Sequence, residues 1–113
     1  MIRVIHDEDF QGYIIRCFYH HLSELGKVII LSLVNNDIFG PFDIEKKLKN
    51  YGINLIHREL YREIETLCML SIFTKQAKKY IFTLPYLSII LKQTMEIELE
   101  LEKLVREIVH HDH

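Results

Sequence analysis

The fold is decided by residues 23–84, which read SELGKVIILSLVNNDIFGPFDIEKKLKNYGINLIHRELYREIETLCMLSIFTKQAKKYIFTL. An apolar helix is predicted over Glu24–Asn36, with the hydroxyl of Ser23 as its N-terminal cap. A charged helix is predicted over Asp43–Tyr51. Pro41 stands just before it, where a missing N–H costs little.

A third helix is predicted over Leu55–Cys68, after a turn at Gly52. Glycine suits that turn because it adopts the left-handed backbone that ends many helices without steric cost. Apolar residues then recur at steps of three and four, the pattern of a helix with one buried face. The residues expected to be buried are Ile56, Leu60, Ile64 and Leu67.

Two stretches after the third helix, Leu70–Thr74 and Tyr80–Leu84, alternate apolar and polar residues and predict a β-hairpin. The tip between them, Lys75–Lys79, is basic, and Ile38-Phe39 could add a short strand to the same sheet. The order is helix, helix, helix, strand, turn, strand. It predicts a winged helix-turn-helix, a mainly α fold with a small β-hairpin.

The last segment predicts a long helix over residues 86–110, although the alternation in Glu96–Leu101 is a strand pattern and argues against one unbroken helix. Its apolar residues follow a three-four pattern for about three heptads. The segment either folds back to complete the core or pairs with its copy in a second chain. We expect pairing, because one small domain seldom needs so long an internal seam. The residues expected at the dimer interface are Leu87, Ile90, Ile97, Leu101, Leu104 and Ile108.

The first residues predict a short strand, Ile2–Ile5, and then a helix that Asp7 caps. Cys17 and Cys68 both fall on apolar helical faces. We expect them to be reduced and buried, since a free cysteine behaves as a small hydrophobe. The winged-helix core is expected over residues 7–85, with the wing over 70–84.

Length and composition indicate a single domain, residues 1–113, that buries its core without disulfides or metal, since 49% of its residues are hydrophobic. No signal peptide is recognisable at the N-terminus. The longest apolar run, Val28–Leu31, is far shorter than the roughly 20 residues of a membrane span. We expect a cytoplasmic protein without membrane contact. The net charge of −2 means that any basic face must be local.

The third helix presents the first candidate contact surface. Its exposed side is expected to carry His57, Arg58, Tyr61 and Arg62, residue types that suit phosphates and base edges. Three glutamates interleave with the two arginines over residues 54–68 and leave a net charge of −1. The surface is therefore either a partner-binding face or a solvated face held by arginine–glutamate pairs, and the charge count favours the second.

The wing tip is the second candidate surface. Lys75, Lys78 and Lys79 place three positive charges on one turn with no acid between them. They could contact a phosphate backbone, or they could simply keep an exposed hairpin soluble, because charged tips are ordinary.

No arrangement of catalytic residues can be proposed. The four glycines stand singly, so no phosphate-binding loop is present, and no serine–histidine–aspartate set stands out. Of the seven histidines, His20 and His21 point to different sides of a helix. The run His110–His113 lies at a chain end, where ligands lack support. We expect no enzymatic activity, no cofactor and no metal.

Several short motifs in residues 7–92 follow one pattern: Asp9-Phe10, Leu22-Ser23, Lys27–Leu31, Leu60 with Ile64 and Leu67, Leu70–Phe73 and Tyr80–Leu87. Together they resemble the C-terminal winged helix that follows the ATPase core in AAA+ and STAND-type ATPases. Walker motifs are absent, and the catalytic residues of that family have no counterparts here. The resemblance therefore implies an ATPase in a longer chain or in a partner.

The expected function is a non-catalytic binding or coupling module of the ATPase-associated type, whose third helix and wing contact a protein or nucleic acid. The alternative is a stand-alone homodimeric winged-helix transcription regulator that binds DNA with the arginines of the third helix and the wing lysines. Such a dimer would carry a charge of −4 and would have to concentrate its positive charge on one face.

Overall fold

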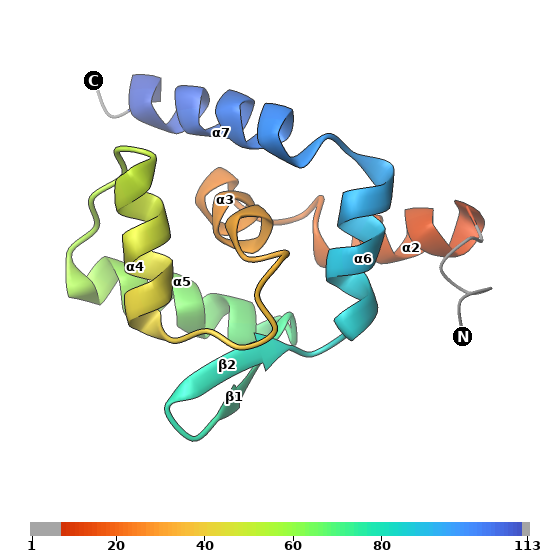
Figure 1. Cartoon of the computed structure of the whole chain (residues 1–113), viewed down its shortest axis with the longest axis horizontal. Helices are drawn as coiled ribbons and strands as arrows, with labels where there is room; N and C mark the ends of the chain where they lie inside the picture. Colours follow the sequence, from red (N-terminus) through yellow and green to blue (C-terminus); the bar gives the residue numbers. More distant parts are fainter. Residues whose placement is uncertain (1–7, 112–113) are drawn as a thin grey trace.

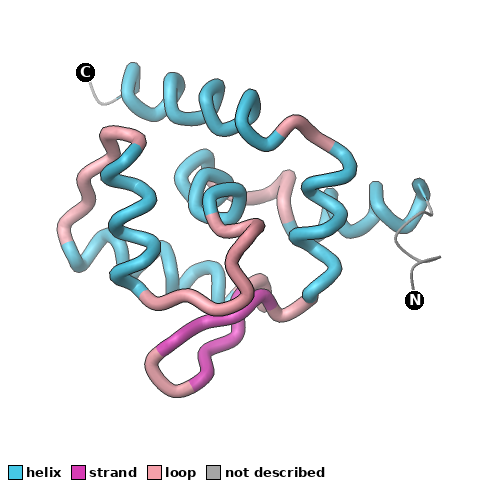
Figure 2. The backbone as a smooth tube through the Cα atoms, in the orientation of Figure 1, coloured by secondary structure: helices cyan, strands magenta, loops and turns pink. Residues whose placement is uncertain are grey.

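The computed structural model describes residues 8–111, which form six α-helices and two antiparallel β-strands (Figure 1). The predicted fold class, mainly helical with a small hairpin, is confirmed; the predicted strand Ile2–Ile5 lies outside the described residues. Figure 2 shows the two strands at one edge of the helical body. The elements are α2 (Glu8–Phe18), α3 (Glu24–Ser32), α4 (Pro41–Asn50), α5 (His57–Met69), β1 (Phe73–Gln76), β2 (Lys79–Phe82), α6 (Pro85–Thr94) and α7 (Ile97–His111).

Helix α3 forms the centre of the molecule and is surrounded by other helices (Figure 1). Its residues 28–31 are at most 1% exposed. The predicted cap is confirmed, because the Ser23 hydroxyl oxygen accepts a hydrogen bond of 3.1 Å from the N–H of Gly26. An apolar helix of this kind is stabilised mainly by burial on all sides.

Helix α3 ends at Ser32, earlier than the predicted Asn36. The N–H of Leu33 donates to the carbonyl of Ile30 at 3.1 Å, a three-residue step that tightens the last turn. The chain then turns, although Leu33 and Val34 remain buried in the core.

The turn between α4 and α5 is made by Gly52, as the sequence predicts. Its φ is 80°, in the left-handed region. The N–H of Gly52 donates to Lys49, and that of Ile53 donates to Leu48 at 2.9 Å, so two carbonyls at the end of α4 are satisfied. Helices α4 and α5 lie within two residues of their predicted bounds.

The same motif ends α5, but with Ser71 in place of glycine. Ser71 has a φ of 63°, and the N–H of Ile72 donates to the carbonyl of Leu67 at 2.9 Å. Leu70 is therefore the cap of the helix and not the start of a strand. The predicted strand Leu70–Thr74 is wrong at its beginning, because the left-handed turn has to be completed before β1 starts.

The hairpin has a two-residue turn, since Gln76 pairs with Lys79. Ala77 has a φ of 58° in this turn. The expected third strand at Ile38-Phe39 is reduced to one bridge: Phe39 and Tyr80 exchange backbone hydrogen bonds of 3.0 and 2.7 Å beside a two-stranded sheet. These bonds tie the segment before α4 to the wing.

The C-terminal segment contains a long helix, α7, but residues 86–110 are not one helix. Helix α6 ends at Thr94, Met95 is extended with φ −148° and ψ 158°, and α7 begins at Ile97. The break lets α7 turn back and cross α3, on the side of the molecule opposite the hairpin (Figure 1).

The apolar seam of this segment is used inside the chain. Of the six residues expected at a dimer interface, Leu87, Ile90, Leu101 and Leu104 are at most 6% exposed, and the other two are half-buried against the core. These side chains therefore pack inside the chain against α3 and its neighbours, and pairing of two chains through them stays an untested prediction. The fold-back alternative is the one observed. The half-buried residues are Ile97 and Ile108.

One residue of the predicted buried face of α5 is misplaced. Leu60, Ile64 and Leu67 are at most 2% exposed, as expected. Ile56 is 59% exposed, because it is the cap before the helix and its N–H donates to Glu59 Oε1 at 3.2 Å.

The expectation for the cysteines is half right. Cys68 is half-buried and packs against the core, whereas Cys17 is exposed. Ile14 and Ile15 of α2, with Tyr19 just after its end, are buried, and this stripe turns Cys17 outward. No helix within residues 8–111 combines the length and the apolarity that crossing a bilayer requires.

Candidate partner-binding surface

The surface formed by α5 and the hairpin contains all seven predicted contact residues. Helix α5 packs beside α4 and leads directly into β1 (Figure 1). All seven side chains are exposed to solvent and so are available to a partner. They are His57, Arg58, Tyr61, Arg62, Lys75, Lys78 and Lys79.

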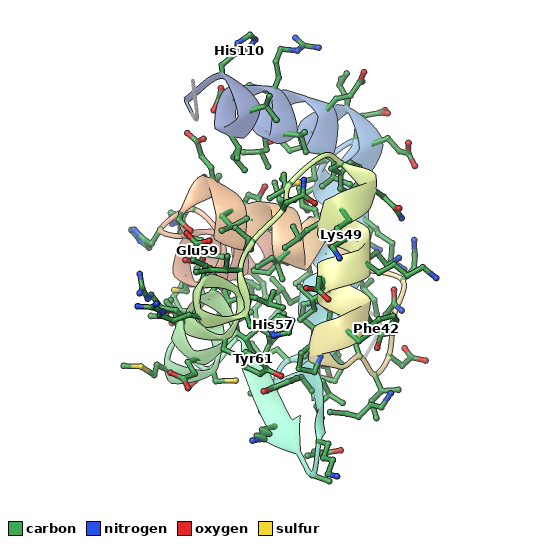
Figure 3. The ribbon with its side chains drawn as sticks, turned by 90° about the vertical axis from the view of Figure 1, so that its left-hand side faces the viewer. Phe42, Lys49, His57, Glu59, Tyr61 and His110 are labelled. Carbon is green, nitrogen blue, oxygen red and sulfur yellow. The ribbon has the colours of Figure 1, made fainter. Side chains whose placement is uncertain are left out.

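One edge of α5 faces α4. His57 Nε2 lies 3.5 Å from Glu45 Oε2, and the rings of His57 and Tyr61 are 6.5 Å apart, edge to face. Figure 3 shows both labelled side chains on the same side of the molecule, close to the hairpin. Glu45 is only 20% exposed, so this contact helps to fix α5 against α4 while most of the imidazole remains in water.

Two of the three acidic residues of α5 are engaged in local contacts. Glu59 accepts a hydrogen bond from the N–H of Ile56 and so caps the helix. Glu63 accepts a hydrogen bond of 3.4 Å from the Ser23 hydroxyl and therefore turns toward α3. The net charge of −1 counted over residues 54–68 thus overstates the repulsion that an anion would meet near Arg58 and Arg62. A carboxylate that binds a backbone N–H or turns toward α3 acts less on the exposed side of α5.

Glu65 is the acid that remains on the hairpin side of α5. Burial raises the pKa of Tyr80, and the Glu65 carboxylate is one of the nearby groups that raise it further. Burial also raises the pKa of the Cys68 thiol, which the ammonium of Lys75 partly lowers and Glu65 raises. Charges of both signs therefore meet where α5 joins the hairpin.

The hairpin separates the wing lysines that the sequence groups together. Lys75 pairs with Tyr80, and the next pair toward the turn contains Lys79; successive pairs point to opposite faces of the ribbon. Lys75 lies on the α5 side, where its charge acts on Cys68. Lys79 lies near the start of α4, with its Cδ 4.0 Å from the position a Cβ on Gly40 would take. Of these two lysines, Lys75 is the one that extends the surface of α5.

Sequence reasoning missed an apolar neighbour of this surface. Phe42 is 71% exposed at the start of α4 and, with His57 and Tyr61, lines a shallow pocket of about 200 Å³. Its position gives a usable signal, since it stands two residues before Ile44 and so falls on the opposite side of α4 from the buried residues.

A second missed signal is the division of charge along the chain. Residues 40–84 contain eight lysines and arginines against five aspartates and glutamates, whereas the rest of the chain contains six against eleven. The first part comprises α4, α5 and the hairpin, and the second supplies α3 and the other helices. The molecule therefore has a basic part and an acidic part although its net charge is only −2.

Metal ligation finds no support in the described part of the chain. No group of three or more histidine, cysteine, aspartate or glutamate side chains lies close enough to hold an ion there. His110 is exposed on α7 (Figure 3), and Asp112 and His113 lie outside the described residues.

Comparison with protein-family models, curated proteins and solved structures gives no match to this chain. The ATPase-associated winged helix that the sequence resembles thus stays a prediction. Arguments about function have to come from the surface geometry itself.

Proposed function

We propose that this chain is a non-catalytic winged-helix module that binds double-stranded nucleic acid with α5 and the α5 side of the hairpin. The observation that carries the proposal is the division of charge, because a basic helix-turn-helix part on an otherwise acidic molecule is suited to one-sided contact with phosphates. An α-helix also fits the width of the major groove of B-form DNA.

Each basic group has an expected role. Arg58 and Arg62 stand one turn apart on the exposed side of α5, where guanidinium groups could reach base edges or phosphates. Lys75 extends that side, and Lys78 occupies the turn of the hairpin, so both would contact the backbone of the duplex. The acidic helices on the far side would orient the approach by repulsion.

Fluorescence anisotropy with a duplex of about 20 base pairs tests the proposal. We expect measurable binding at about 50 mM salt that weakens steeply by about 200 mM salt. R58A/R62A should abolish most of the binding, whereas R16A removes an exposed charge on the distant α2 and should leave it unchanged. A wild-type chain without binding at the lower salt concentration would refute the nucleic-acid proposal.

A second candidate, a coupling module that contacts a protein, is supported by exposed apolar groups. Phe42 is 71%, Ile56 59% and Tyr61 46% exposed near α5. Aromatic side chains are enriched in protein interfaces. F42S separates the two candidates, since a protein contact centred on the shallow pocket would be lost while duplex binding through the arginines would be kept.

A further inference from the structure

Three exposed rings lie where the start of α4 meets α5. Phe42 is 71% and Tyr61 46% exposed, and the side chain of His57 is 79% exposed. The rings of His57 and Tyr61 stand at 89° to one another, so they form two walls of a corner. Figure 3 shows the three labelled residues on one side of the molecule, close to the hairpin. The nearby rings of Phe39 and Phe73, by contrast, pack against each other in the core.

The three rings border a shallow pocket of about 200 Å³, here named the Phe42 pocket. It is lined by Pro41, Phe42, Glu45, His57, Leu60 and Tyr61. Pockets that enclose a drug-sized ligand are larger, at roughly 300–1,000 Å³, so this one suits a single flat ring system. Its polar group is the Glu45 carboxylate, which can accept a hydrogen bond from an amino group of a ligand.

Cationic side chains stand on two sides of the Phe42 pocket. Lys79 of the hairpin approaches the start of α4, with its Cδ 4.0 Å from the position a Cβ on Gly40 would take. Lys49 is exposed seven residues after Phe42, on the same side of α4 and about 10 Å further along its axis. The carboxylate of Asp43 is bound to the backbone, since it accepts a hydrogen bond of 2.7 Å from the N–H of Gly40. The rim therefore favours an anionic ligand.

We propose that the Phe42 pocket binds one unpaired base of the nucleic acid that α5 contacts. A nucleotide joins a flat aromatic base to an anionic phosphate, and the rings and the lysines match this combination. An apolar side chain of a protein partner would gain little from the lysines on the rim. The inference rests on the proposed function and adds that nucleic acid with an unpaired base is preferred to a fully paired duplex.

The position of the pocket fits a base displaced from the duplex. At 100° per residue Tyr61 is about 60° around α5 from Arg58, so the pocket opens beside the arginines. Extruding a paired base costs pairing and stacking energy, whereas a base without a partner loses less. The pocket should therefore be filled when an unpaired base is present and stay empty on a fully paired duplex.

Fluorescence anisotropy with three duplexes of one sequence, at about 50 mM salt, tests the proposal. The first duplex is fully paired, the second carries one unpaired adenine at its centre, and the third carries an abasic sugar in place of that adenine. Adenine is used because its amino group can donate a hydrogen bond to Glu45. Comparison of the last two duplexes isolates the base, since both have the same charge and a bulge at the same place.

Wild type should bind the adenine duplex at least about fivefold more tightly than the abasic duplex, the low end of the effect of stacking one base. F42A should remove most of this difference and leave the affinity for the fully paired duplex within about twofold of wild type. Y13A is the matched control, because Tyr13 is 56% exposed on the distant α2, and it should keep the difference. Circular dichroism checks that each variant is folded.

Equal wild-type affinity for the adenine and abasic duplexes would overturn the proposal while the proposed function stands, and would leave the Phe42 pocket to a protein contact. A preference for adenine that F42A retains in full would equally overturn it. Absence of binding to all three duplexes would refute the proposed function and this inference with it.

Discussion

Tyr19 offers a prediction whose sign is opposite to the usual effect of a core substitution. Its side chain is 2% exposed, and its hydroxyl has no hydrogen-bond partner among the described residues. Burial raises the pKa of this phenol, and the carboxylate of Glu100 raises it further. A buried, unsatisfied hydroxyl lowers stability, because it has lost its water without gaining a protein partner. Y19F removes the oxygen and keeps the ring.

The expected gain is about 1 kcal/mol in the free energy of unfolding, taken from the low end of the penalty for an unsatisfied buried group. The aromatic contacts should persist in the variant. Lys27 Nζ lies 5.3 Å from the ring centroid, and the ring of His20 lies 5.7 Å away in a T-shaped arrangement. Phenylalanine presents a similar face to both. In a domain of this size, 1 kcal/mol corresponds to a rise of about 4–8 °C in Tm.

Urea unfolding followed by circular dichroism measures the change, with the m-value as a check that the unfolded state is unaltered. Y13F is the matched control, because Tyr13 is 56% exposed; its effect on the free energy of unfolding should be within about 0.5 kcal/mol. A loss of about 1 kcal/mol or more in Y19F would refute the reasoning, since it would mean that the hydroxyl makes a stabilising hydrogen bond.

Four further predictions concern stability and binding. Burial raises the pKa values of four groups: Tyr19, Tyr51, Cys68 and Tyr80. Above about pH 9 the unfolded chain therefore loses protons that the folded chain keeps, which lowers stability. The urea midpoint should fall between about pH 8 and pH 10.5, and it should fall less steeply in Y19F. L60A should lower the free energy of unfolding by about 2–5 kcal/mol, because the side chain is 2% exposed, and calorimetry would show this as a lower Tm. A77G should raise the free energy of unfolding by about 0.5–1 kcal/mol, since the left-handed φ of 58° at this position suits glycine. G52A should lower the free energy of unfolding by a similar amount, because Gly52 has a φ of 80°; paired urea titrations compare the two variants. If the surface binds a duplex, K75A should weaken anisotropy-detected binding more than K79A, because Lys75 lies on the α5 side of the hairpin.

Local signals in the sequence account for most of the helical framework. Ser23 before an acidic residue and Gly52 after a charged helix are strong markers of a helix start and a helix end, and both function as predicted. The spacing of Leu60, Ile64 and Leu67 identifies the buried side of α5 because a helix repeats every 3.6 residues. These features depend on neighbouring residues only.

The features that the sequence revealed only in part or not at all depend on contacts between distant segments. Ser71 takes a left-handed conformation that serine rarely adopts, and it does so where Ile72 can enter the core beside Leu67. The break at Met95 exchanges one long helix for two, which is favourable because α7 can then cover α3. In both places tertiary packing outweighs local propensity.

The candidate surface shows the same division between local and distant information. That Arg58 and Arg62 would be exposed follows from helical spacing alone. Which glutamates stay near them does not, because the directions of Glu59 and Glu63 are set by the Ile56 N–H and by Ser23 on another helix. The separation of Lys75 from Lys79 likewise depends on the register of the hairpin.

The division of charge bears on how a partner would approach. A net charge of −2 would repel a polyanion from every direction if it were spread evenly over the surface. Of the acidic residues outside residues 40–84, seven lie on α2, α3 and α7, so repulsion is concentrated on these helices. An anionic partner would therefore be turned toward α5 and the hairpin during its approach, an effect on the association rate that salt weakens. Orientation of the approach, more than total charge, should govern how fast the α5 surface finds its partner.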